Sequence, residues 1–312
     1  MTALIDGDIL IYTIGHASQT NIYRFKFYDE RPDFYFPVGN TKSYIIKLLN
    51  NPDNDYGFTS EDGILESSIQ YKHFNLQIHQ MNKLINSILD GVNRDTYRLF
   101  LTSDDHSNFR YDIAKTKPYK ANRGKKPVYY NELRGYLIVH WNAEVVRGQE
   151  ADDAIGINMD VEFYQNPVIV STDKDLDQIP GTHYNFKTGK LYEIEDGQSL
   201  ELSSNRRKLT GGGYAWFYAQ MLMGDSTDNI PGISGCGPVN TYKLLKDCKT
   251  ELDYMEKVWS VYKNGDKDLK IKGVSEDVVK DRFLEVADLL WIRRKDNEKK
   301  SEEISWLSSC EE

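Results

Sequence analysis

The 312-residue sequence contains only three cysteines, no long apolar run and no overall positive charge. Cys236, Cys248 and Cys310 have no metal-ligand spacing, and their odd number fits a reducing compartment rather than a disulfide framework. No window of about 18 apolar residues could form a membrane-spanning helix. The start, MTALIDGDILIY, lacks the basic residues of a signal peptide. We therefore expect a cytoplasmic protein without a membrane partner.

The net charge of −9 argues against a nucleic-acid-binding surface over the whole protein, but positive charge is concentrated in one segment. Residues 110–126 contain seven Lys and Arg residues against one Asp, with two tyrosines between them. A basic strip with aromatic residues can bind a phosphate backbone, although a solvated, mobile loop has the same composition. The expected DNA contacts in this strip are Arg110, Lys115, Lys117, Tyr119 and Lys125.

Short apolar runs alternate with segments of helical periodicity in the first part of the chain. Strands are predicted at residues 3–5, 98–103, 143–146 and 167–170. Helices are expected from residue 9 and over residues 67–89, 129–138 and 151–159. Because strands alternate with helices, we predict an α/β fold with a mainly parallel sheet flanked by helices.

The chain is expected to divide into an α/β core and a helical subdomain. The core is predicted to span residues 1–205, the helical subdomain residues 206–292, and a charged, partly mobile tail residues 293–312. Within the core, the aromatic-rich residues 20–63 are interpreted as a hairpin insertion, and residues 184–194 as a second hairpin.

Carboxylates follow each predicted strand. Asp6, Asp173 and one of Asp104 and Asp105 come after apolar runs, and Glu150 follows the third run. The carboxyl ends of parallel strands meet at one edge of a sheet, so these side chains should lie together and repel one another unless cations neutralise them. Each motif alone could instead be a turn or a helix N-cap. The candidates are Asp6, Asp104, Asp105, Glu150, Asp152, Asp153, Asp173, Asp175, Asp225 and Asp228.

This acidic set includes no histidine or cysteine. A set of oxygen ligands selects hard ions, so we expect Mg²⁺ or Mn²⁺. So many carboxylates favour two ions, which about 4 Å apart can support phosphodiester hydrolysis.

One stretch, GDSTDNIPGISGCG from Gly224 to Gly237, carries both an acidic pair and a glycine-rich turn. Asp225 and Asp228 are three residues apart, so on a helical turn they would project from one face. Gly232, Gly235 and Gly237 would leave backbone N–H groups open to a phosphate. With helices expected over residues 214–223 and 239–245, the stretch forms a helix, turn, helix unit, in which Lys243 is a further expected DNA contact.

Lys120 and Arg123 lie within the motif YKANR in the basic segment. If this motif is helical, the two cations share one face. There they could bind the scissile phosphate and offset charge that develops in the transition state. The alternative is a general role in phosphate positioning.

The order of five motifs resembles the 5′-nuclease (flap endonuclease) superfamily, in particular the bacteriophage 5′-to-3′ exonucleases. The motifs are DG at Asp6, YKANR, GQEADD, STDKDLD and GDSTDNIPGISGCGP, and they cover residues 1 to about 250. The resemblance implies an α/β nuclease core of the PIN type, with a helix-three-turn-helix subdomain. It also implies two divalent ions held by the acids named above, and a K⁺ ion at the glycine turn. Lys120 and Arg123 match the basic residues of an arch or gateway, which would lie within residues of about 105–140.

The function implied by the resemblance is metal-dependent hydrolysis of phosphodiester bonds at the 5′ ends, flaps or nicks of duplex DNA, in replication or repair. If the phage-type resemblance holds, the enzyme acts in the cytoplasm of an infected host. We expect a monomer that works beside replication proteins. Two alternatives stay open: a ribonuclease on RNA primers in RNA–DNA hybrids, and a non-catalytic protein that binds branched DNA.

Overall fold

The computed structural model describes residues 2–37, 39–93, 96–160, 166–265 and 275–304. The chain forms two compact units. The larger unit contains residues 1–9, 84–125 and 134–312, and the smaller unit contains residues 10–83 and 126–133. Helices α1 (Gly7–Ala17), α3 (Phe74–Val92) and α5 (Tyr130–His140) include residues of both units.

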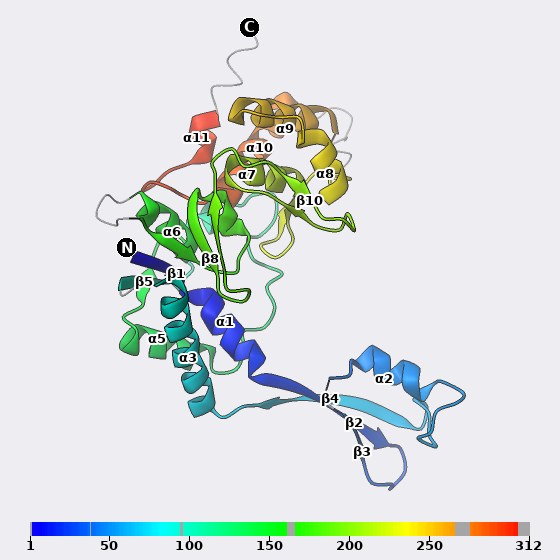
Figure 1. Ribbon diagram of the computed structural model, residues 1–312. Coiled ribbons are helices and arrows are strands. Elements are labelled where there is room, and N and C mark those ends of the chain that lie inside the picture. Colours follow the sequence, from blue (N-terminus) through cyan, green and yellow to red (C-terminus); the bar gives the residue numbers. More distant parts are fainter. Residues whose placement is uncertain (1, 38, 94–95, 161–165, 266–274, 305–312) are drawn as a thin grey trace. The chain divides into compact units, whose positions relative to one another are not determined.

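A six-stranded sheet forms the centre of the larger unit (Figure 1). Its order is β6 (Glu144–Val146), β5 (Thr96–Thr102), β1 (Thr2–Asp6), β7 (Val168–Val170), β8 (Gly181–Asn185) and β9 (Lys190–Ile194). The first five strands are parallel, and β9 returns antiparallel to β8. All four strands predicted for the parallel sheet are thereby confirmed, as is the hairpin over residues 184–194.

The central strand β1 is buried along its whole length. Apolar residues fill positions 3–5 because neighbouring strands flank β1 on both edges and helix α6 (Ala151–Met159) packs against it. Gly7 begins α1 directly after Asp6, where a Cβ would lie 2.6 Å from the Phe100 carbonyl oxygen. The turn from strand to helix is therefore tight, and it fixes Asp6 at the carboxyl edge of the sheet.

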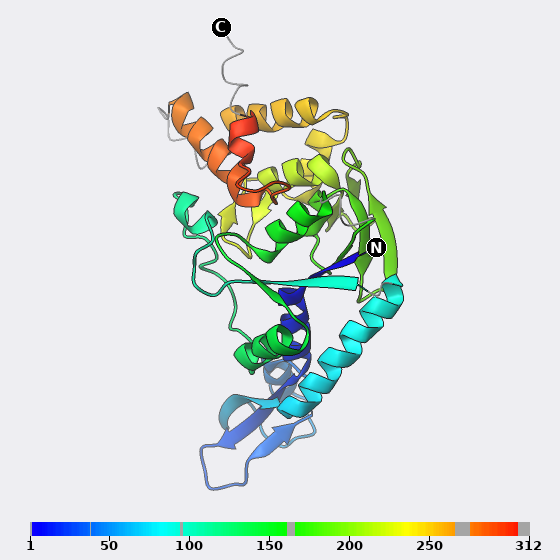
Figure 2. The ribbon, with the colours of Figure 1, turned by 90° about the vertical axis from the view of Figure 1, so that its left-hand side faces the viewer.

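The helices of the second half of the chain pack around α7 (Gly213–Met223), which is buried over almost its entire surface (Figures 1 and 2). The other elements of the second half are η1 (Asp175–Gln178), α8 (Pro238–Leu245), α9 (Glu251–Gly265), α10 (Glu276–Leu290) and α11 (Lys300–Ile304). The short helix α4 (Arg110–Ile113), from the first half of the chain, contacts α10. Trp216, Phe217 and Tyr218 supply the large side chains of this core. Because α7 also contacts η1, the core is joined to the edge of the sheet.

Two small hairpins lie among these helices, although strands were not expected after residue 206. They pair β10 (Glu201–Leu202) with β11 (Leu209–Thr210), and β12 (Gly224–Asp225) with β13 (Ile230–Pro231). Helices α7 to α11 belong to the same compact unit as the six-stranded sheet. The domain boundary expected at residue 205 stays a prediction.

Part of the predicted tail is packed against the rest of the larger unit. Arg293, Lys300 and Ile304 are 6%, 2% and 4% exposed. Lys300 is held by Glu251 at 2.7 Å and Glu303 at 2.8 Å. Residues 305–312, and Cys310 with them, lie outside the described residues.

The smaller unit has its own core. A three-stranded antiparallel sheet of order β3 (Phe34–Phe36), β2 (Gln19–Phe27) and β4 (Gly63–Tyr71) packs against α2 (Lys42–Leu49). Aromatic rings in mutual contact, such as those of Phe25 and Phe58, fill it. The hairpin insertion is confirmed, but the helix predicted from residue 67 begins only at Phe74, because residues 67–71 pair with β2.

No helix in the part of the chain that the structure describes is long and apolar enough to cross a membrane.

Candidate functional site

Asp6 lies at the carboxyl end of the central strand and is buried. The Ile9 N–H donates to its Oδ1 at 3.1 Å, and the Ser171 hydroxyl donates to its Oδ2 at 2.9 Å. Burial, followed by the neighbouring charges of Asp8 and Asp173, raises the pKa of Asp6 to about 7. The carboxylate is thus held rigidly in a place where its charge is costly unless a cation is present.

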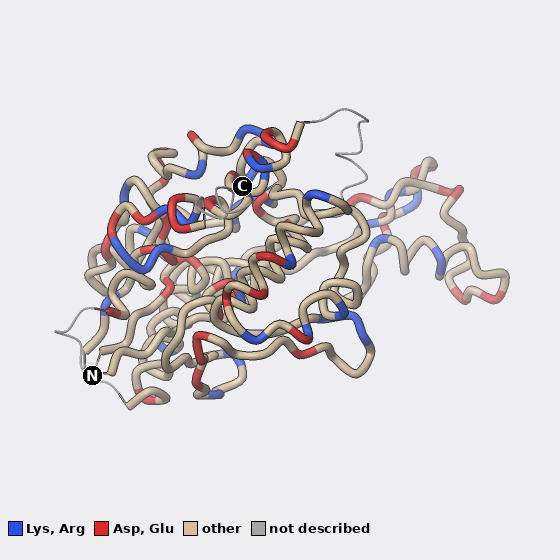
Figure 3. Tube along the Cα trace, turned by 90° about the horizontal axis from the view of Figure 1, so that it is seen from above, with Lys and Arg blue, Asp and Glu red and all other residues tan. Residues whose placement is uncertain are grey.

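Six further carboxylates line one cavity of about 250 Å³. They come from the start of α6, the end of β7, η1 and the β12–β13 hairpin, and they are Glu150, Asp152, Asp173, Asp175, Asp225 and Asp228. Of the acids predicted to follow the strands, Glu150 and Asp173 line this cavity, and the hairpin adds Asp225 and Asp228. Overall, acidic and basic residues are interspersed along the trace (Figure 3), so this cavity is a local concentration of negative charge.

Mutual repulsion and burial disfavour the charged forms of these acids. Burial and the charges of Asp6 and Asp173 raise the pKa of Asp152 well above its ordinary value. Burial and the charges of Asp173 and Asp225 raise the pKa of Asp175 to about 8. Divalent cations would relieve both effects, and oxygen donors of this kind suit Mg²⁺ or Mn²⁺. Within the described residues, however, no three His, Cys, Asp or Glu side chains are already arranged to hold one ion.

Two cations approach the acids from the YKANR segment. The Lys120 ammonium forms an ion pair with Glu150 and lies 3.8 Å from Asp228 Oδ2. Arg123 contacts Asp228 Oδ1 at 3.1 Å. Burial lowers the pKa of Lys120 to about 8, although the negative charge of Asp228 acts to raise it. Lys120 is thus an internal counter-charge for two of the acids.

The YKANR segment is a turn rather than the helix considered above. Lys120 has φ 58°, and its N–H donates to the Asp228 carbonyl at 2.9 Å. Asn229 Nδ2 donates to the Pro118 carbonyl at 2.8 Å. These backbone contacts, rather than helical periodicity, bring Lys120 and Arg123 to the same side.

Tyr119 was expected to contact DNA, and this expectation is wrong. Its side chain is 6% exposed, and its hydroxyl donates to Asp228 Oδ2 at 2.8 Å and lies 3.3 Å from Glu150 Oε2. Tyr119 therefore holds two of the acids in position.

Asp225 and Asp228 lie in a hairpin rather than on a helical turn, so this part of the prediction is wrong. The Thr227 N–H donates to Asp225 Oδ1 at 2.8 Å, which closes the loop. Gly224 has φ 70°, and a Cβ there would lie 2.2 Å from the Gly232 nitrogen. Both glycines are needed because the two hairpin strands approach this closely.

Arg110 and Asp153 form a buried ion pair, which contradicts the roles predicted for both. Arg110 is 3% exposed and cannot contact DNA, and Asp153 is fully buried. Two parallel hydrogen bonds of 2.6 and 2.9 Å join them. Asp153 also accepts from the N–H groups of Glu150 and Arg293, both at 3.0 Å. Its oxygens are fully used, so Asp153 holds the start of α6 in place rather than facing the cavity.

The end of α10 and the residues that directly follow it complete this arrangement. Arg110 donates to the carbonyls of Leu289 at 2.9 Å and Trp291 at 2.6 Å. Residues 289–293 are therefore tied to the start of α6, and through it to Glu150 and Asp152.

Asp104 and Asp105 follow β5 as predicted, but neither lines the acidic cavity. Asp104 lies 3.3 Å from Arg134, and Asp105 lies 3.4 Å from Arg147. Asp8 is the acid nearer to Asp6: its Oδ2 accepts from the Thr102 N–H at 3.0 Å, and its charge contributes to the raised pKa of Asp6. In the sequence, the position of Asp8 two residues after Asp6 could have indicated that the two carboxylates lie close together.

Gln220 is a residue of the site that no sequence motif indicated. Its Nε2 donates to Asp175 Oδ1 at 2.6 Å, and its Oε1 accepts from Gln178 Nε2 at 2.7 Å. Gln178 also donates to the Leu290 carbonyl at 2.9 Å. Both glutamines are buried, so they connect Asp175 to the same segment after α10.

Of the remaining expected DNA contacts, Lys115, Lys117, Lys125, Gly235, Gly237 and Lys243 are exposed. Gly232 is half-buried against the backbone of Met223 and Gly224. Gly237 caps α8, Pro238 occupies its first turn, and Gly235 has φ 85°. The basic strip is anchored by Glu285, which accepts from the N–H groups of Lys115 and Thr116 at 2.6 and 2.7 Å.

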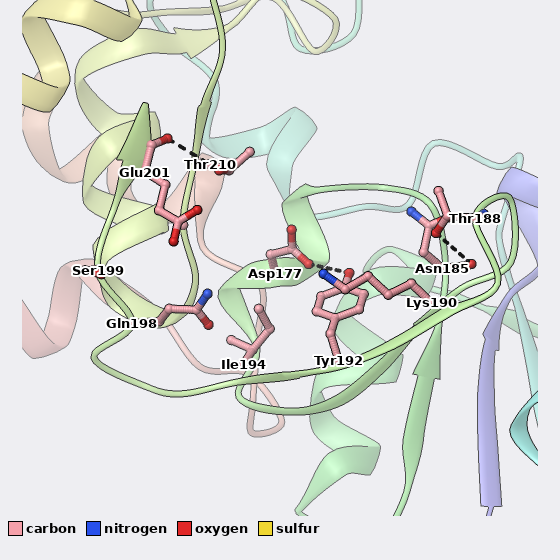
Figure 4. A pocket seen from close by; sticks show the side chains of 11 residues that line it. Asp177, Asn185, Thr188, Lys190, Tyr192, Ile194, Gln198, Ser199, Glu201 and Thr210 are labelled. Atoms are coloured by element: carbon pink, nitrogen blue, oxygen red, sulfur yellow. Dashed lines mark hydrogen bonds between the residues drawn. The ribbon is translucent and has the colours of Figure 1, made fainter. Parts of the chain in front are cut away.

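A second cavity, of about 330 Å³, lies beside the β8–β9 hairpin (Figure 4). Its two carboxylates belong to Asp177 and Glu201, and Lys190 also lines it. Tyr192 already donates to Asp177 at 2.9 Å. With less negative charge and one carboxylate engaged, this cavity is a weaker candidate for binding metal ions.

No protein-family model matches the chain. In sequence, the chain is 30% identical over 136 residues to the flap endonuclease Xni of Shewanella pealeana, a match that covers 40% of this chain and 50% of that protein. It is 34% identical over 137 residues to DNA polymerase I of Pseudomonas aeruginosa, covering 41% of this chain and 14% of the polymerase. The sequence comparisons confirm the resemblance to the flap endonuclease superfamily, although the chain spans half or less of these relatives.

Solved structures of the T5 5′-exonuclease are also similar. A mutant of that enzyme matches with a TM-score of 0.43 and 17% identity, over 68% of this chain and 81% of that chain. The form with bound zinc ions matches with a TM-score of 0.42 and 19% identity, over 67% and 76%.

Proposed function

We propose that this chain, which is similar in sequence to bacterial flap endonucleases, is a metal-dependent 5′ nuclease that hydrolyses phosphodiester bonds at 5′ ends, flaps or nicks of duplex DNA. The observation that carries the proposal is the cavity lined by six carboxylates, with Lys120 and Arg123 at its acids. A fold without a use for cations would have no reason to bury so much like charge, because each carboxylate raises the pKa of the next.

Asp152, Asp173, Asp175 and Asp225 would hold two Mg²⁺ or Mn²⁺ ions, with Asp6 and Glu150 supporting them. Bound there, the ions would activate water and stabilise the leaving oxygen. Modest movements of these side chains would be required, since no three of the described acids are arranged as a ligand set. A K⁺ ion at the glycine turn is a further expectation from the resemblance.

Lys120 and Arg123 would bind the scissile phosphate. Lys120 already lies against Glu150 and Asp228, and Arg123 against Asp228, so a phosphate that enters the cavity would meet their N–H donors. These donors would offset the negative charge that grows on the phosphate oxygens in the transition state. The hydrogen bond from the Lys120 N–H to the Asp228 carbonyl fixes the turn and with it the direction of the Lys120 and Arg123 side chains.

Duplex DNA would be bound outside the cavity. Gly235, Gly237 and Lys243 would contact one backbone strand at the start of α8, while Lys115, Lys117 and Lys125 would contact the strand that enters the site. Unpairing a terminal nucleotide costs a few kcal/mol, so ends and flaps are favoured over intact duplex. Replication or repair in the cytoplasm is the setting that this substrate implies, and RNA–DNA hybrids are the alternative substrate.

The test is Mg²⁺-dependent cleavage of a 5′-labelled flap and a 5′-labelled blunt duplex, with EDTA as the metal-free control. Asp173→Asn should abolish cleavage while duplex binding is retained. Asp104→Asn is the matched control, because Asp104 lies outside the cavity, and it should cut like the wild type. Binding of both substrates without cleavage in Mg²⁺ or Mn²⁺ would instead support the branched-DNA-binding alternative. Cleavage of a matched hybrid at the higher rate would favour the ribonuclease.

A further inference from the structure

The smaller unit exposes apolar side chains that its own core leaves uncovered. Seven of the thirteen large exposed hydrophobic side chains of the described residues belong to it: Tyr28, Tyr35, Tyr44, Ile64, Ile69, Tyr71 and Leu76. Its charges nearly balance, with eight Lys and Arg residues against nine Asp and Glu residues. A neutral surface rich in tyrosine and isoleucine fits a protein partner better than a phosphate backbone.

Strand β4 is an open edge of this unit. The sheet order is β3-β2-β4, so one side of β4 pairs with β2 and the other side pairs with no strand among the described residues (Figure 1). Residues 67–71 are all exposed, and Ile64, Ile69 and Tyr71 are 52%, 45% and 42% exposed. A nine-residue edge of this kind presents backbone N–H and C=O groups that can pair with another strand.

The usual features that protect an edge are missing from β4. Its sequence, GILESSIQY, contains no proline and no lysine. Its one charged residue, Glu66, forms an ion pair with Arg24 of the neighbouring strand. A strand that approaches this edge therefore meets little electrostatic repulsion.

The edge is complementary to itself. In antiparallel pairing, opposite residues make hydrogen bonds of the same kind, so two copies of β4 must be related by an axis that passes through a residue position. Only an axis at Ser67 pairs all nine residues of both copies, because Ser67 is the midpoint of Gly63–Tyr71. That register places Leu65 opposite Ile69. It places Glu66 opposite Ser68, whereas an axis at Glu66 would bring two carboxylates together.

We propose that this protein forms a symmetric dimer in which the β4 edges of two copies pair antiparallel about Ser67. The two three-stranded sheets then become one six-stranded sheet, and both open edges are removed. The dimer uses no residue of the acidic cavity, so it is independent of the nuclease activity. It replaces the monomer expected from the sequence.

The first experiment compares single-cysteine variants under mild oxidation. In Ser67→Cys the two introduced thiols lie directly opposite each other, within the Cα separation that a disulfide requires. In the matched control, Ser68→Cys, each thiol faces Glu66 of the other copy, and the two thiols lie too far apart. We expect a disulfide-linked dimer from Ser67→Cys at least about tenfold faster than from Ser68→Cys or the wild type. Mass spectrometry would assign the bond, since Cys236 and Cys248 are also free.

The second experiment measures mass by sedimentation equilibrium. The wild type and Asp173→Asn should both be dimers. Ser67→Lys should be monomeric, because it sets two ammonium groups opposite each other, while its circular dichroism stays that of the wild type. Its Tm should fall only by the stabilisation that dimerisation gives the wild type at the same concentration. A wild-type monomer, a Ser67→Lys dimer, or equal cross-linking of the two cysteine variants would each overturn the proposal.

Discussion

Lys120 is the residue at which charge balance and the proposed catalysis would meet. Its ammonium contacts Glu150 and Asp228, so it partly neutralises the acids in the absence of metal ions. A phosphate in the cavity would draw the same ammonium toward its oxygens. One side chain thus serves the metal-free protein and the reaction in turn.

We expect Lys120→Met to lower the cleavage rate about 100-fold, the usual effect of removing one donor that stabilises transition-state charge. Without the ammonium, Glu150 and Asp228 repel the neighbouring acids more strongly, so Mg²⁺ should raise the Tm of the variant more than that of the wild type. Single-turnover cleavage and thermal unfolding measure the two effects. Lys187→Met, at an exposed lysine in the turn between β8 and β9, is the control, and equal rates for Lys120→Met and wild type would contradict the proposed role.

Arg110 is a structural residue whose removal should be severe. Arg110→Ala leaves Asp153 buried without its cation, which costs about 3–5 kcal/mol in the free energy of unfolding. Urea denaturation measures the loss, and Arg147→Ala, a largely exposed arginine, should change little. If Arg110 instead bound DNA, the variant would keep its stability and lose duplex affinity.

At the scale of elements, the segment after α10 positions two parts of the site. It accepts hydrogen bonds from Arg110 and, through Gln178 and Gln220, orients Asp175. Partners of metal-binding carboxylates commonly tune metal affinity without touching the ion.

We therefore expect Gln220→Leu to raise the Mg²⁺ concentration needed for half-maximal cleavage by about 10–100-fold. Leucine keeps most of the volume but cannot donate to Asp175, so the fold should persist. Mn²⁺ binding followed by calorimetry gives a readout apart from cleavage. Gln198→Leu, at the second cavity, provides the comparison, and an unchanged Mg²⁺ requirement would exclude a positioning role for Gln220.

The sequence predicted elements well where one local pattern determines them. Apolar runs that end in acids located β1, β5, β6 and β7, and parallel topology brought Asp6, Asp152 and Asp173 toward one edge. Contacts between distant residues could not be read in this way. Arg110 appears as one more cation in a basic strip, yet it pairs with Asp153, 43 positions later.

The hairpin shows a second limit. Asp225 and Asp228 have helical spacing, but Gly224 and Gly232 allow two short strands to approach more closely than side chains would permit. Spacing alone cannot distinguish the two conformations. Asp225 and Asp228 nevertheless line the same cavity, as they would on a helical turn.

At the scale of the molecule, the crowded acids make the stability of the metal-free protein depend on pH. The raised pKa values of Asp6, about 7, and Asp175, about 8, mean that the folded chain binds protons more tightly than the unfolded chain, whose carboxyls titrate near 3.8. The contribution of these two carboxyl groups to the free energy of unfolding is therefore present at acid pH and is lost as the pH rises through about 7 to 8.

We expect the Tm in EDTA to fall between about pH 5 and about pH 8, and Mg²⁺ to reduce this fall because the ions bind the charged carboxylates. Asp6→Asn should also reduce it, since the amide has no proton to lose. Differential scanning calorimetry at a series of pH values measures the slope. A Tm in EDTA that rises across this range would show that the acids are not held close together.

The hydrogen bonds that tie residues 289–293 to Arg110, Asp153 and Gln178 have a consequence for biosynthesis. A nascent chain that has emerged only as far as α9 contains every carboxylate of the cavity, but the ion pair beneath Glu150 and the glutamine behind Asp175 still lack their backbone partners. Domains form from the N-terminus as the ribosome advances, so the proposed catalytic centre would be assembled last. If the proposed function holds, a polypeptide released early would be unable to damage the nucleic acid around it.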